Sequence, residues 1–408
     1  MCKQNDILIN ITGMKILFEC RSITPSTSCG IENFAYAVIR SVAACYPESK
    51  IVCSVPSWGY DAYRKVLQVN SNTNIVIISD PIQHKIIQLH RYFPMKVLLL
   101  GLREIFPFLM RIYRGTRKNW IKEMDNCCDV VIYPYHHDEI LHLKTPSVLV
   151  LHDFYDFEYN SETNLRLRAI ITRNVKIAKA VICCWPEPFE QLNRRFPEKL
   201  PHLYMIPFLM DRPDFSKYTH IQKKERQFIF ASSTAKHKNH IRLIEALGIL
   251  KKKGHEKITI ICPGKIYTES FKEIENKIIE QDVEGWIKFL GFIDREDIYK
   301  AYCESIAVIS PTTYEAFSGA ILEGFQAGLP VACSRIKQLE LFIDTYLKVK
   351  VSYFDPLDTA DIANAIEHIF SDYLFYQSES LKAKKFLENL TEKSTADSYY
   401  KVLLSVLN

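Results

Sequence analysis

The stretch that decides the fold joins a short apolar run to a polar turn and a small helix. It reads Ile306-Ala-Val-Ile-Ser310, then Pro311-Thr-Thr-Tyr-Glu-Ala-Phe-Ser-Gly319, and continues as Ala-Ile-Leu-Glu-Gly-Phe-Gln-Ala to Gly328. An apolar run of this length, ended by a proline, is typical of a buried strand. A glycine after a helical pattern marks the end of a helix. The stretch therefore predicts a strand that leads directly into a helix.

Similar apolar runs recur along the chain and alternate with longer amphipathic segments. Such alternation favours parallel sheets covered by helices on both faces. The series stops at a polar stretch with two prolines, 207–226, and then resumes. We therefore predict an α/β protein of two doubly wound, Rossmann-like domains facing across a cleft, 1–206 and 227–385, joined by a linker at 207–226. The predicted strands are 15–19, 75–79, 130–133, 147–152, 180–184, 228–232, 258–262, 287–290, 306–310 and 331–334.

Length and composition suit a cytoplasmic protein. A chain of 408 residues is long enough for two domains. No apolar run reaches the roughly 18–20 uncharged residues that span a bilayer, and the N-terminus lacks the pattern of a secretory signal. The twelve cysteines are scattered, without a C-x-x-C pair or zinc-ligand spacing. Free thiols in a reducing compartment are the expected state.

Two carboxylates, Glu315 and Glu323, lie eight positions apart across the junction of strand and helix. A carboxylate accepts hydrogen bonds from two hydroxyls at once, so this pair can hold two polyol parts of one ligand. Between them, the amides of Phe317, Ser318 and Gly319 lie at a helix N-terminus, where unpaired N–H groups and the helix dipole favour a phosphate. Sugar-binding carboxylates beside a phosphate site predict a nucleotide-sugar site.

This segment resembles the retaining GT-B glycosyltransferases of family 4, also called the group 1 transferases. They carry two glutamates at this spacing followed by Gly-x-Pro-Val, here Gly328-Leu-Pro330-Val331. The chain departs from the family at Ala316, where a glycine is usual, and lacks a proline soon after Gly319. The resemblance implies a GT-B fold with the acceptor in the first domain and the donor in the second. It also implies a C-terminal helix, 386–408, that crosses back to the first domain.

A lysine stands where a diphosphate needs a positive charge. Lys238 lies between a predicted strand and an amphipathic helix, and an ammonium there can neutralise a diphosphate. The resemblance assigns this role to Lys238. Many family members add an arginine slightly earlier, where this chain has serines beginning at Ser232, and Lys236 or His237 could replace it. Ile293 lies in the loop where the family packs the nucleobase.

Two positions in the first domain also match the family. Gly30 lies between a strand and a helix, where the family has a glycine-rich turn that touches the donor phosphate and the acceptor; an ordinary tight turn is equally compatible. His152 ends a strand and matches a family histidine that contacts the sugar near the reacting centre, with a structural histidine as the alternative. His136, His137 and Asp138 end another strand and are candidates for the acceptor side.

The resemblance implies transfer of a sugar, with retention, from a nucleoside-diphosphate donor such as GDP-mannose or a UDP-sugar. The expected acceptor is a glycan, lipid-linked, in the synthesis of O-antigen or capsule. Glu315, Lys238 and His152 are the expected catalytic residues, and Glu323 the ribose ligand. No Asp-x-Asp occurs, so lysine and backbone amides are expected to replace a metal, and we expect no cofactor. A catalytically silent GT-B nucleotide-binding subunit and a GT-B nucleotide-sugar epimerase remain alternatives.

Residues 84–122 are strongly basic, with nine Lys/Arg against one acid, whereas the whole chain has a net charge of +5. Basic residues interleaved with aromatic and leucine side chains suit a segment that lies on anionic lipid. A helix pair that covers the core and has a basic outer face is an equal alternative. No nucleic-acid-binding motif accompanies the charge, so nucleic acid is not an expected partner. Peripheral attachment to the inner face of the cell membrane follows from the first interpretation.

Overall fold

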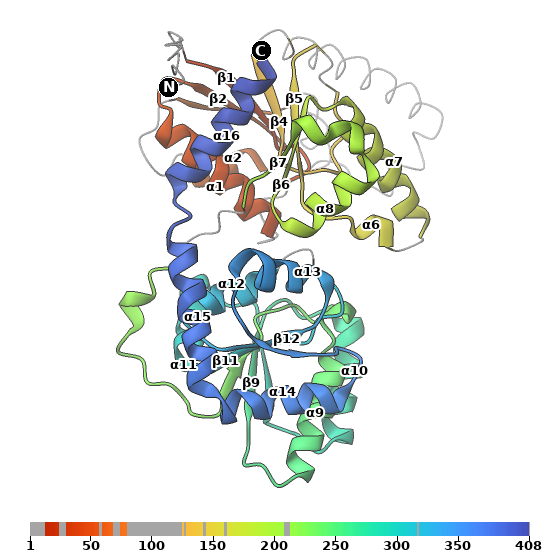
Figure 1. The fold of residues 1–408 in the computed structure, drawn as a ribbon, viewed down its shortest axis with the longest axis vertical. Helices are drawn as coiled ribbons and strands as arrows, with labels where there is room; N and C mark the ends of the chain where they lie inside the picture. The colour runs from red at the N-terminus through yellow and green to blue at the C-terminus, as the bar shows by residue number, and fades with distance from the viewer. Residues whose placement is uncertain are drawn as a thin grey trace, which may run out of the picture. The chain divides into compact units, whose positions relative to one another are not determined.

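A computed structural model of the chain describes residues 13–23, 30–56, 59–67, 74–79, 125, 128–141, 144–158, 161–207, 213–315 and 318–407. The chain divides into two compact units. The first unit comprises Met1–Asp211 with Thr391–Asn408, and the second comprises Arg212–Leu390. Each unit is built on its own parallel sheet flanked by helices (Figure 1).

In the described part of the first unit, seven parallel strands pair in the order β3-β2-β1-β4-β5-β6-β7. The strands are β1 (Lys15–Glu19), β2 (Lys50–Val55), β3 (Ile75–Ser79), β4 (Val130–Tyr133), β5 (Ser147–Leu151), β6 (Ala180–Cys183) and β7 (Leu203–Met205). The helices are α1 (Gly30–Cys45), α2 (Tyr60–Leu67), α6 (Tyr155–Glu158), α7 (Glu162–Ile177), α8 (Pro186–Arg195), the 3₁₀ helix η2 (Pro197–His202) and α16 (Glu392–Leu407).

The second unit has six parallel strands among its described residues, in the order β10-β9-β8-β11-β12-β13. They are β8 (Gln227–Ile229), β9 (Thr259–Pro263), β10 (Ile287–Gly291), β11 (Ala307–Ser310), β12 (Val331–Ser334) and β13 (Ser352–Phe354). The helical elements are η3 (Phe215–Tyr218), η4 (Lys236–Lys238), α9 (His240–Lys252), α10 (Thr268–Glu280), α11 (Arg295–Glu304), α12 (Gly319–Gln326), α13 (Lys337–Glu340), the π-helical η5 (Leu341–Leu347), α14 (Thr359–Ser371) and α15 (Tyr373–Glu388).

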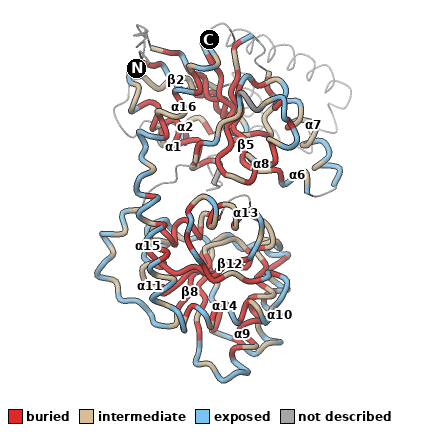
Figure 2. The backbone as a smooth tube through the Cα atoms, in the orientation of Figure 1, coloured by how far each residue is buried: buried red, intermediate tan, exposed pale blue. Residues whose placement is uncertain are grey.

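Burial explains why the apolar runs form strands. Every residue of β4, β5, β6, β11 and β12 is buried, as expected for parallel strands covered on both faces. Figure 2 shows the buried backbone concentrated at the centre of each unit. In the first unit, Leu149 of β5 joins Val175 of α7 in one core, and in the second Ile309 of β11 joins Leu247 of α9 in another.

Each sheet has a switch point at which the order of the strands reverses. It lies between β1 and β4 in the first unit and between β8 and β11 in the second. In open parallel sheets, ligands bind beyond the carboxyl ends of the strands at such a point. We therefore expect ligands at the loops after β1 and β4 in the first unit, and at the loops after β8 and β11 in the second.

The ends of the second unit differ in detail from the sequence-based boundaries. Residues 213–226, expected to be a linker, lie against the second unit, where the ring of Phe215 meets Tyr299 at 5.7 Å and the amide of Lys224 donates to the Glu304 carbonyl at 2.8 Å. The helix expected at 386–408 is divided between α15 and α16. Thr391 caps α16, because its hydroxyl accepts a hydrogen bond from the Ser394 amide at 3.0 Å.

The last helix belongs to the first unit, where α16 packs on α1. The rings of Tyr46 and Tyr400 stack with centroids 3.7 Å apart, and the Tyr46 hydroxyl donates to Asp397 at 2.8 Å. Ser49 and Tyr400 share a further hydrogen bond of 3.2 Å. The chain therefore enters the second unit near 211 and returns to the first near 391.

Candidate functional site

The switch point of the second unit brings Lys238 and Glu315 together. Lys238 follows β8 and Glu315 follows β11, and the lysine Nζ lies 2.6 Å from Oε1 of the glutamate. The two side chains are 18% and 9% exposed. The sequence predicted both residues for the site but not that they pair with each other. A positive and a negative group thus meet at the edge of the sheet where a ligand is expected.

Asn239 holds the Lys238 turn in place. Its backbone adopts the left-handed conformation, φ 62° and ψ 35°, which asparagine tolerates better than most residues. Its buried side-chain amide donates to the Pro311 carbonyl at 2.9 Å and to the Pro356 carbonyl at 2.7 Å. The turn is therefore tied to the loop after β11. This anchoring explains the position of the lysine beside the glutamate.

Helix α12 begins at the same edge. The Ser318 side chain caps the helix by accepting from the Ile321 amide at 3.4 Å, and Gly319 is the first helical residue. The amide of Gly319 has no acceptor within the helix, as at any helix start. Gly324 lets the helix lie close to β11, because a Cβ there would meet Cγ2 of Val308 at 2.4 Å. The prediction for Phe317 lies outside the described residues.

Glu323 is held by a residue that the sequence did not single out. Its carboxylate is 5% exposed and accepts from Nη1 of Arg295, at the start of α11, at 2.9 Å. The guanidinium is 42% exposed and also lies over the Tyr299 ring, 5.1 Å from its centroid. The only sequence signal was a basic residue at a helix start, two positions after Ile293. Whether that position faces Glu323 depends on how α11 packs against α12.

His237 is not a source of positive charge at neutral pH. Burial, together with the neighbouring Lys238, lowers the pKa of His237 to about 4. Its carbonyl accepts hydrogen bonds from the Thr313 amide at 2.8 Å and the Thr312 hydroxyl at 3.0 Å. Of the two candidates for the missing arginine, His237 can therefore donate a hydrogen bond but not a charge. Lys236 is exposed.

The loops of Ser232 and Ile293, predicted to border the phosphate and the nucleobase, lie in a region where backbone packs closely against backbone. A Cβ at Gly264, after β9, would lie 2.1 Å from the Ser232 carbonyl oxygen, so only glycine fits there. The Gly264 amide donates to the Gly291 carbonyl at 2.8 Å. Ile293 is half-buried, two residues before α11. The loops after β8, β9 and β10 therefore lie side by side at the carboxyl edge of the sheet.

In the first unit, His152 is buried at the end of β5. Its Nε2–H donates to the Pro134 carbonyl at 2.8 Å, and its ring meets Phe34 edge-on, with centroids 4.9 Å apart. Burial lowers the pKa of His152 to about 4, so the ring is neutral. Only Nδ1 is then an acceptor for a ligand. Gly30 is the first residue of α1, at the switch-point end of β1, and the six residues before it lie outside the described chain.

The neighbouring strand end carries a further polar cluster. His136 and His137 follow β4, and Nε2 of His137 lies 2.6 Å from Oδ2 of Asp156 in α6. The sequence suggested the two histidines for the acceptor side but did not point to Asp156. Among the described residues, these three form the one group whose ligand atoms lie close enough to hold a metal ion. The expectation of no metal stays a prediction.

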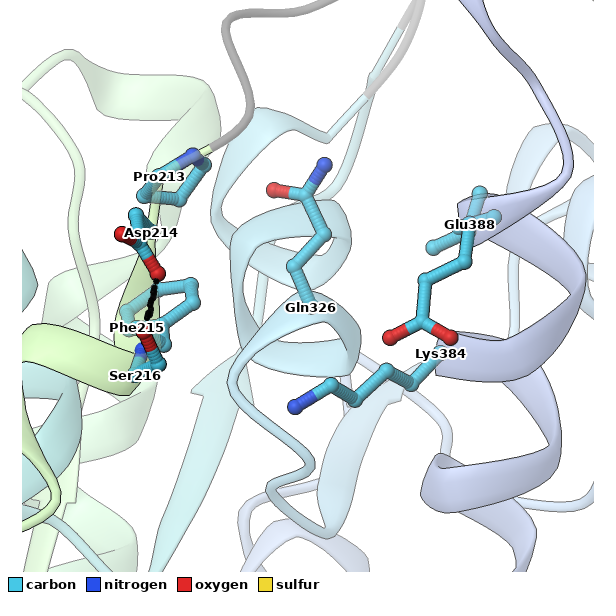
Figure 3. A pocket seen from close by; sticks show the side chains of 8 residues that line it. Pro213, Asp214, Phe215, Ser216, Gln326, Lys384 and Glu388 are labelled. Atoms are coloured by element: carbon cyan, nitrogen blue, oxygen red, sulfur yellow. Dashed lines mark hydrogen bonds between the residues drawn. The ribbon is translucent and has the colours of Figure 1, made fainter.

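One hollow in the second unit lies away from this chemistry. Its volume is about 220 Å³, and Figure 3 shows Lys384 and Glu388 of α15 on one side and Asp214 with its neighbours on the other. Gln326, the last residue of α12, also lines it. The hollow is therefore at the opposite end of α12 from Ser318 and is not the candidate site.

No helix in the described part of the chain is long and apolar enough to cross a membrane. The basic segment 84–122 lies outside the described residues. Lipid contact by this segment therefore stays a prediction.

Comparison with known proteins agrees with the geometry. Residues 211–389 match the family described as Glycosyl transferases group 1. A stretch of 103 residues is 30% identical to the O-antigen chain mannosyltransferase B of Escherichia coli, covering 25% of this chain and 26% of that protein. The chain spans only about a quarter to a half of the length of the curated relatives it matches.

Solved structures match over nearly the whole chain. Anabaena HepE, solved with UDP and glucose, superposes with a TM-score of 0.66 at 16% identity, over 96% of this chain and 100% of that one. WaaG, a glycosyltransferase involved in lipopolysaccharide biosynthesis, gives a TM-score of 0.64 at 14% identity, over 95% and 99%. Likeness at such identities shows the fold. The chain has the GT-B fold of two Rossmann-like units, and the match to the Glycosyl transferases group 1 family lies in the second of them, at residues 211–389.

Proposed function

We propose that the protein is a glycosyltransferase that moves a sugar, with retention, from a nucleoside-diphosphate sugar to a glycan acceptor. The observation that carries the proposal is the Lys238–Glu315 pair, 2.6 Å apart at the switch point of the second unit. It supplies a cation for the diphosphate and a carboxylate for the sugar hydroxyls side by side. The bound UDP of HepE and the family match at 211–389 support this choice of ligand.

The division of roles follows from the charge at each position. Lys238 and the first amides of α12 stabilise the departing diphosphate, an electrostatic effect worth a few kcal/mol per donor, roughly. Glu315 accepts from the sugar hydroxyls, and Glu323, fixed by Arg295, accepts from the ribose. The loops with Ser232 and Ile293 border the phosphate and the base. In this proposal no metal holds the diphosphate, so EDTA leaves nucleotide binding unchanged.

The first unit takes the acceptor in this proposal. His152 presents the neutral Nδ1 of its ring to a sugar hydroxyl, because Nε2 is bound to the Pro134 carbonyl. The E. coli relative acts on the O-antigen chain by its name, and WaaG acts in lipopolysaccharide biosynthesis. These similarities support a lipid-linked acceptor of surface polysaccharide synthesis. Residues 84–122 would then hold the protein on the cytoplasmic face of the membrane.

The test is a panel of GDP- and UDP-sugars, with thermal shift for binding and chromatography for release of the nucleotide. Transfer is expected with one donor, and NMR of the product should show the anomeric configuration of the donor retained. Inversion would refute retention alone. Nucleotide binding with no turnover on any acceptor would indicate the silent binding subunit. Conversion of the donor to another nucleotide sugar without acceptor would indicate an epimerase.

A further inference from the structure

A cluster of imidazole and carboxylate groups in the first unit has no part in the proposed transfer. His136 and His137 follow β4, and Asp156 lies in α6, which follows β5. One potential ligand atom from each residue lies within 4.8 Å of the other two. His136 is 1% exposed, and the side chains of Asp156 and His137 are 6% and 20% exposed. Three donor groups therefore converge from two neighbouring strand ends, largely shielded from water.

His136 contributes a nitrogen that the protein leaves unused. Its Nε2 is buried and has no hydrogen-bond partner, which is an unusual state for a buried polar atom. A buried imidazole nitrogen of this kind, beside a second imidazole and a carboxylate, is suited to a metal ion.

We propose that His136, His137 and Asp156 bind a divalent transition metal, for which Zn²⁺ is the best match. Two imidazoles and a carboxylate, with a position left open, form a common zinc ligand set. Ca²⁺ and Mg²⁺ prefer oxygen ligands throughout, which makes them poor candidates. The proposal does not depend on the glycosyltransferase function. It departs from the sequence-based expectation of no metal. That expectation rested on the absence of zinc-ligand spacing and of an Asp-x-Asp motif for the diphosphate.

The proton positions allow this binding. In the metal-free protein the proton on Nε2 of His137 is donated to Oδ2 of Asp156, because a carboxylate only accepts. When the metal takes its place, the proton moves to Nδ1 of His137, and the Tyr135 hydroxyl oxygen, 2.6 Å away, accepts it. Nδ1 of His136 accepts from the His152 amide, so the proton of this ring lies on Nε2. Binding a metal at Nε2 moves that proton to Nδ1 and gives up the hydrogen bond from the His152 amide, at 3.3 Å the longest in the cluster.

The surrounding groups orient the ligands as outer partners do in metal sites. The Tyr135 hydroxyl sets the ring of His137. The Asn164 side-chain amide donates to Oδ1 of Asp156 at 3.2 Å, leaving Oδ2 toward His137. The guanidinium of Arg168 donates to the Asp156 carbonyl. Asp156 is therefore fixed from both sides before any metal arrives.

The test is zinc binding by the full-length chain without a histidine tag. Competition with a chromogenic chelator should give one Zn²⁺ per chain. His137→Ala and Asp156→Asn should each weaken binding at least about 10- to 100-fold, since even outer-shell changes have effects of that size. His202→Ala, an exposed histidine of the same unit, and Glu158→Gln, an exposed residue of the same helix, are matched controls that should leave affinity unchanged.

Cobalt distinguishes this site from cysteine thiols, which also bind zinc. Co²⁺ in a site of two imidazoles and a carboxylate gives visible d–d bands without the near-ultraviolet charge-transfer band of thiolate ligands. That spectrum on the wild-type chain supports the site even if a variant fails to fold. A chain that takes up no stoichiometric Zn²⁺ at micromolar free metal, a thiolate band, or binding unaltered in both His137→Ala and Asp156→Asn would overturn the proposal.

Discussion

Glu315→Gln is expected to separate nucleotide binding from sugar transfer. In the ligand-free protein the carboxylate holds Nζ of Lys238 at 2.6 Å, so it competes with a diphosphate for the same ammonium. With side chains only 18% and 9% exposed, the pair is largely shielded from solvent, so the roughly 1 kcal/mol of an exposed ion pair is the smallest contribution expected. Because about 1.4 kcal/mol corresponds to a tenfold change in affinity, UDP or GDP should bind at least about fivefold more tightly to the variant.

Turnover should move in the opposite direction. In the proposed function Glu315 accepts from the sugar hydroxyls, and removal of one preorganised polar contact to the reacting sugar typically lowers the rate by roughly two orders of magnitude. Calorimetry with UDP and GDP, which lack the sugar, and rate measurements with the nucleotide sugar address the two effects separately. Glu273→Gln, an exposed glutamate of α10, is the matched control and should change neither. Weaker nucleotide binding in Glu315→Gln would refute the competition, and an unchanged rate would refute the role in transfer.

Three further predictions concern other parts of the chain. Lys238→Ala should weaken UDP binding about tenfold or more and lower turnover about 100-fold, because a charge-assisted hydrogen bond is lost; Lys252→Ala, on an exposed part of α9, should do neither. The pKa of His152 falls from 6.5 to about 4 on folding, so the free energy of unfolding decreases as the pH falls from about 6.5 toward 4, by about 1.4 kcal/mol per pH unit. Urea unfolding at about pH 7 and 5 should show a smaller decrease in His152→Gln than in the wild-type chain. In segment 84–122, four basic residues are changed to Glu: Arg111, Arg114, Arg117 and Lys118. This variant should no longer pellet with anionic vesicles at low salt, but it should bind nucleotide as the wild-type chain does.

The sheets could be predicted from the sequence because their strands are short, continuous apolar runs that are buried on both faces. β5, β6 and β11 fall where the apolar pattern placed them. Three strands, β2, β7 and β13, were missed. β2 carries Lys50 and Ser54 within it, and β7 and β13 have only three residues each. The ends of helices were also hard to place. Thr391 caps the start of α16 and so divides the helix predicted at 386–408 into two.

The candidate site was predictable as a set of residue types but not as a set of contacts. Lys238 and Glu315 are 77 positions apart, and their pairing depends on the order β8-β11, which places sequence-distant strands side by side. Apolar patterns predict that strands form, but they do not specify which strands are neighbours. Asn239 illustrates the same limit, because its bonds to the Pro311 and Pro356 carbonyls connect three separate loops. His136, His137 and Asp156 likewise follow no spacing motif.

The two glutamates of the quoted stretch differ in how firmly they are held. Glu323 is fixed by Arg295 and is nearly inaccessible, 5% exposed, so its carboxylate is oriented before a ligand arrives and little entropy is lost on binding. Glu315 is paired with Lys238, and in the proposed function the ammonium of Lys238 turns to the diphosphate when the donor binds. One carboxylate is therefore preorganised and the other is exchangeable. On this reasoning Glu323→Gln weakens nucleotide binding, whereas Glu315→Gln strengthens it, although both residues belong to a single spacing pattern in the sequence.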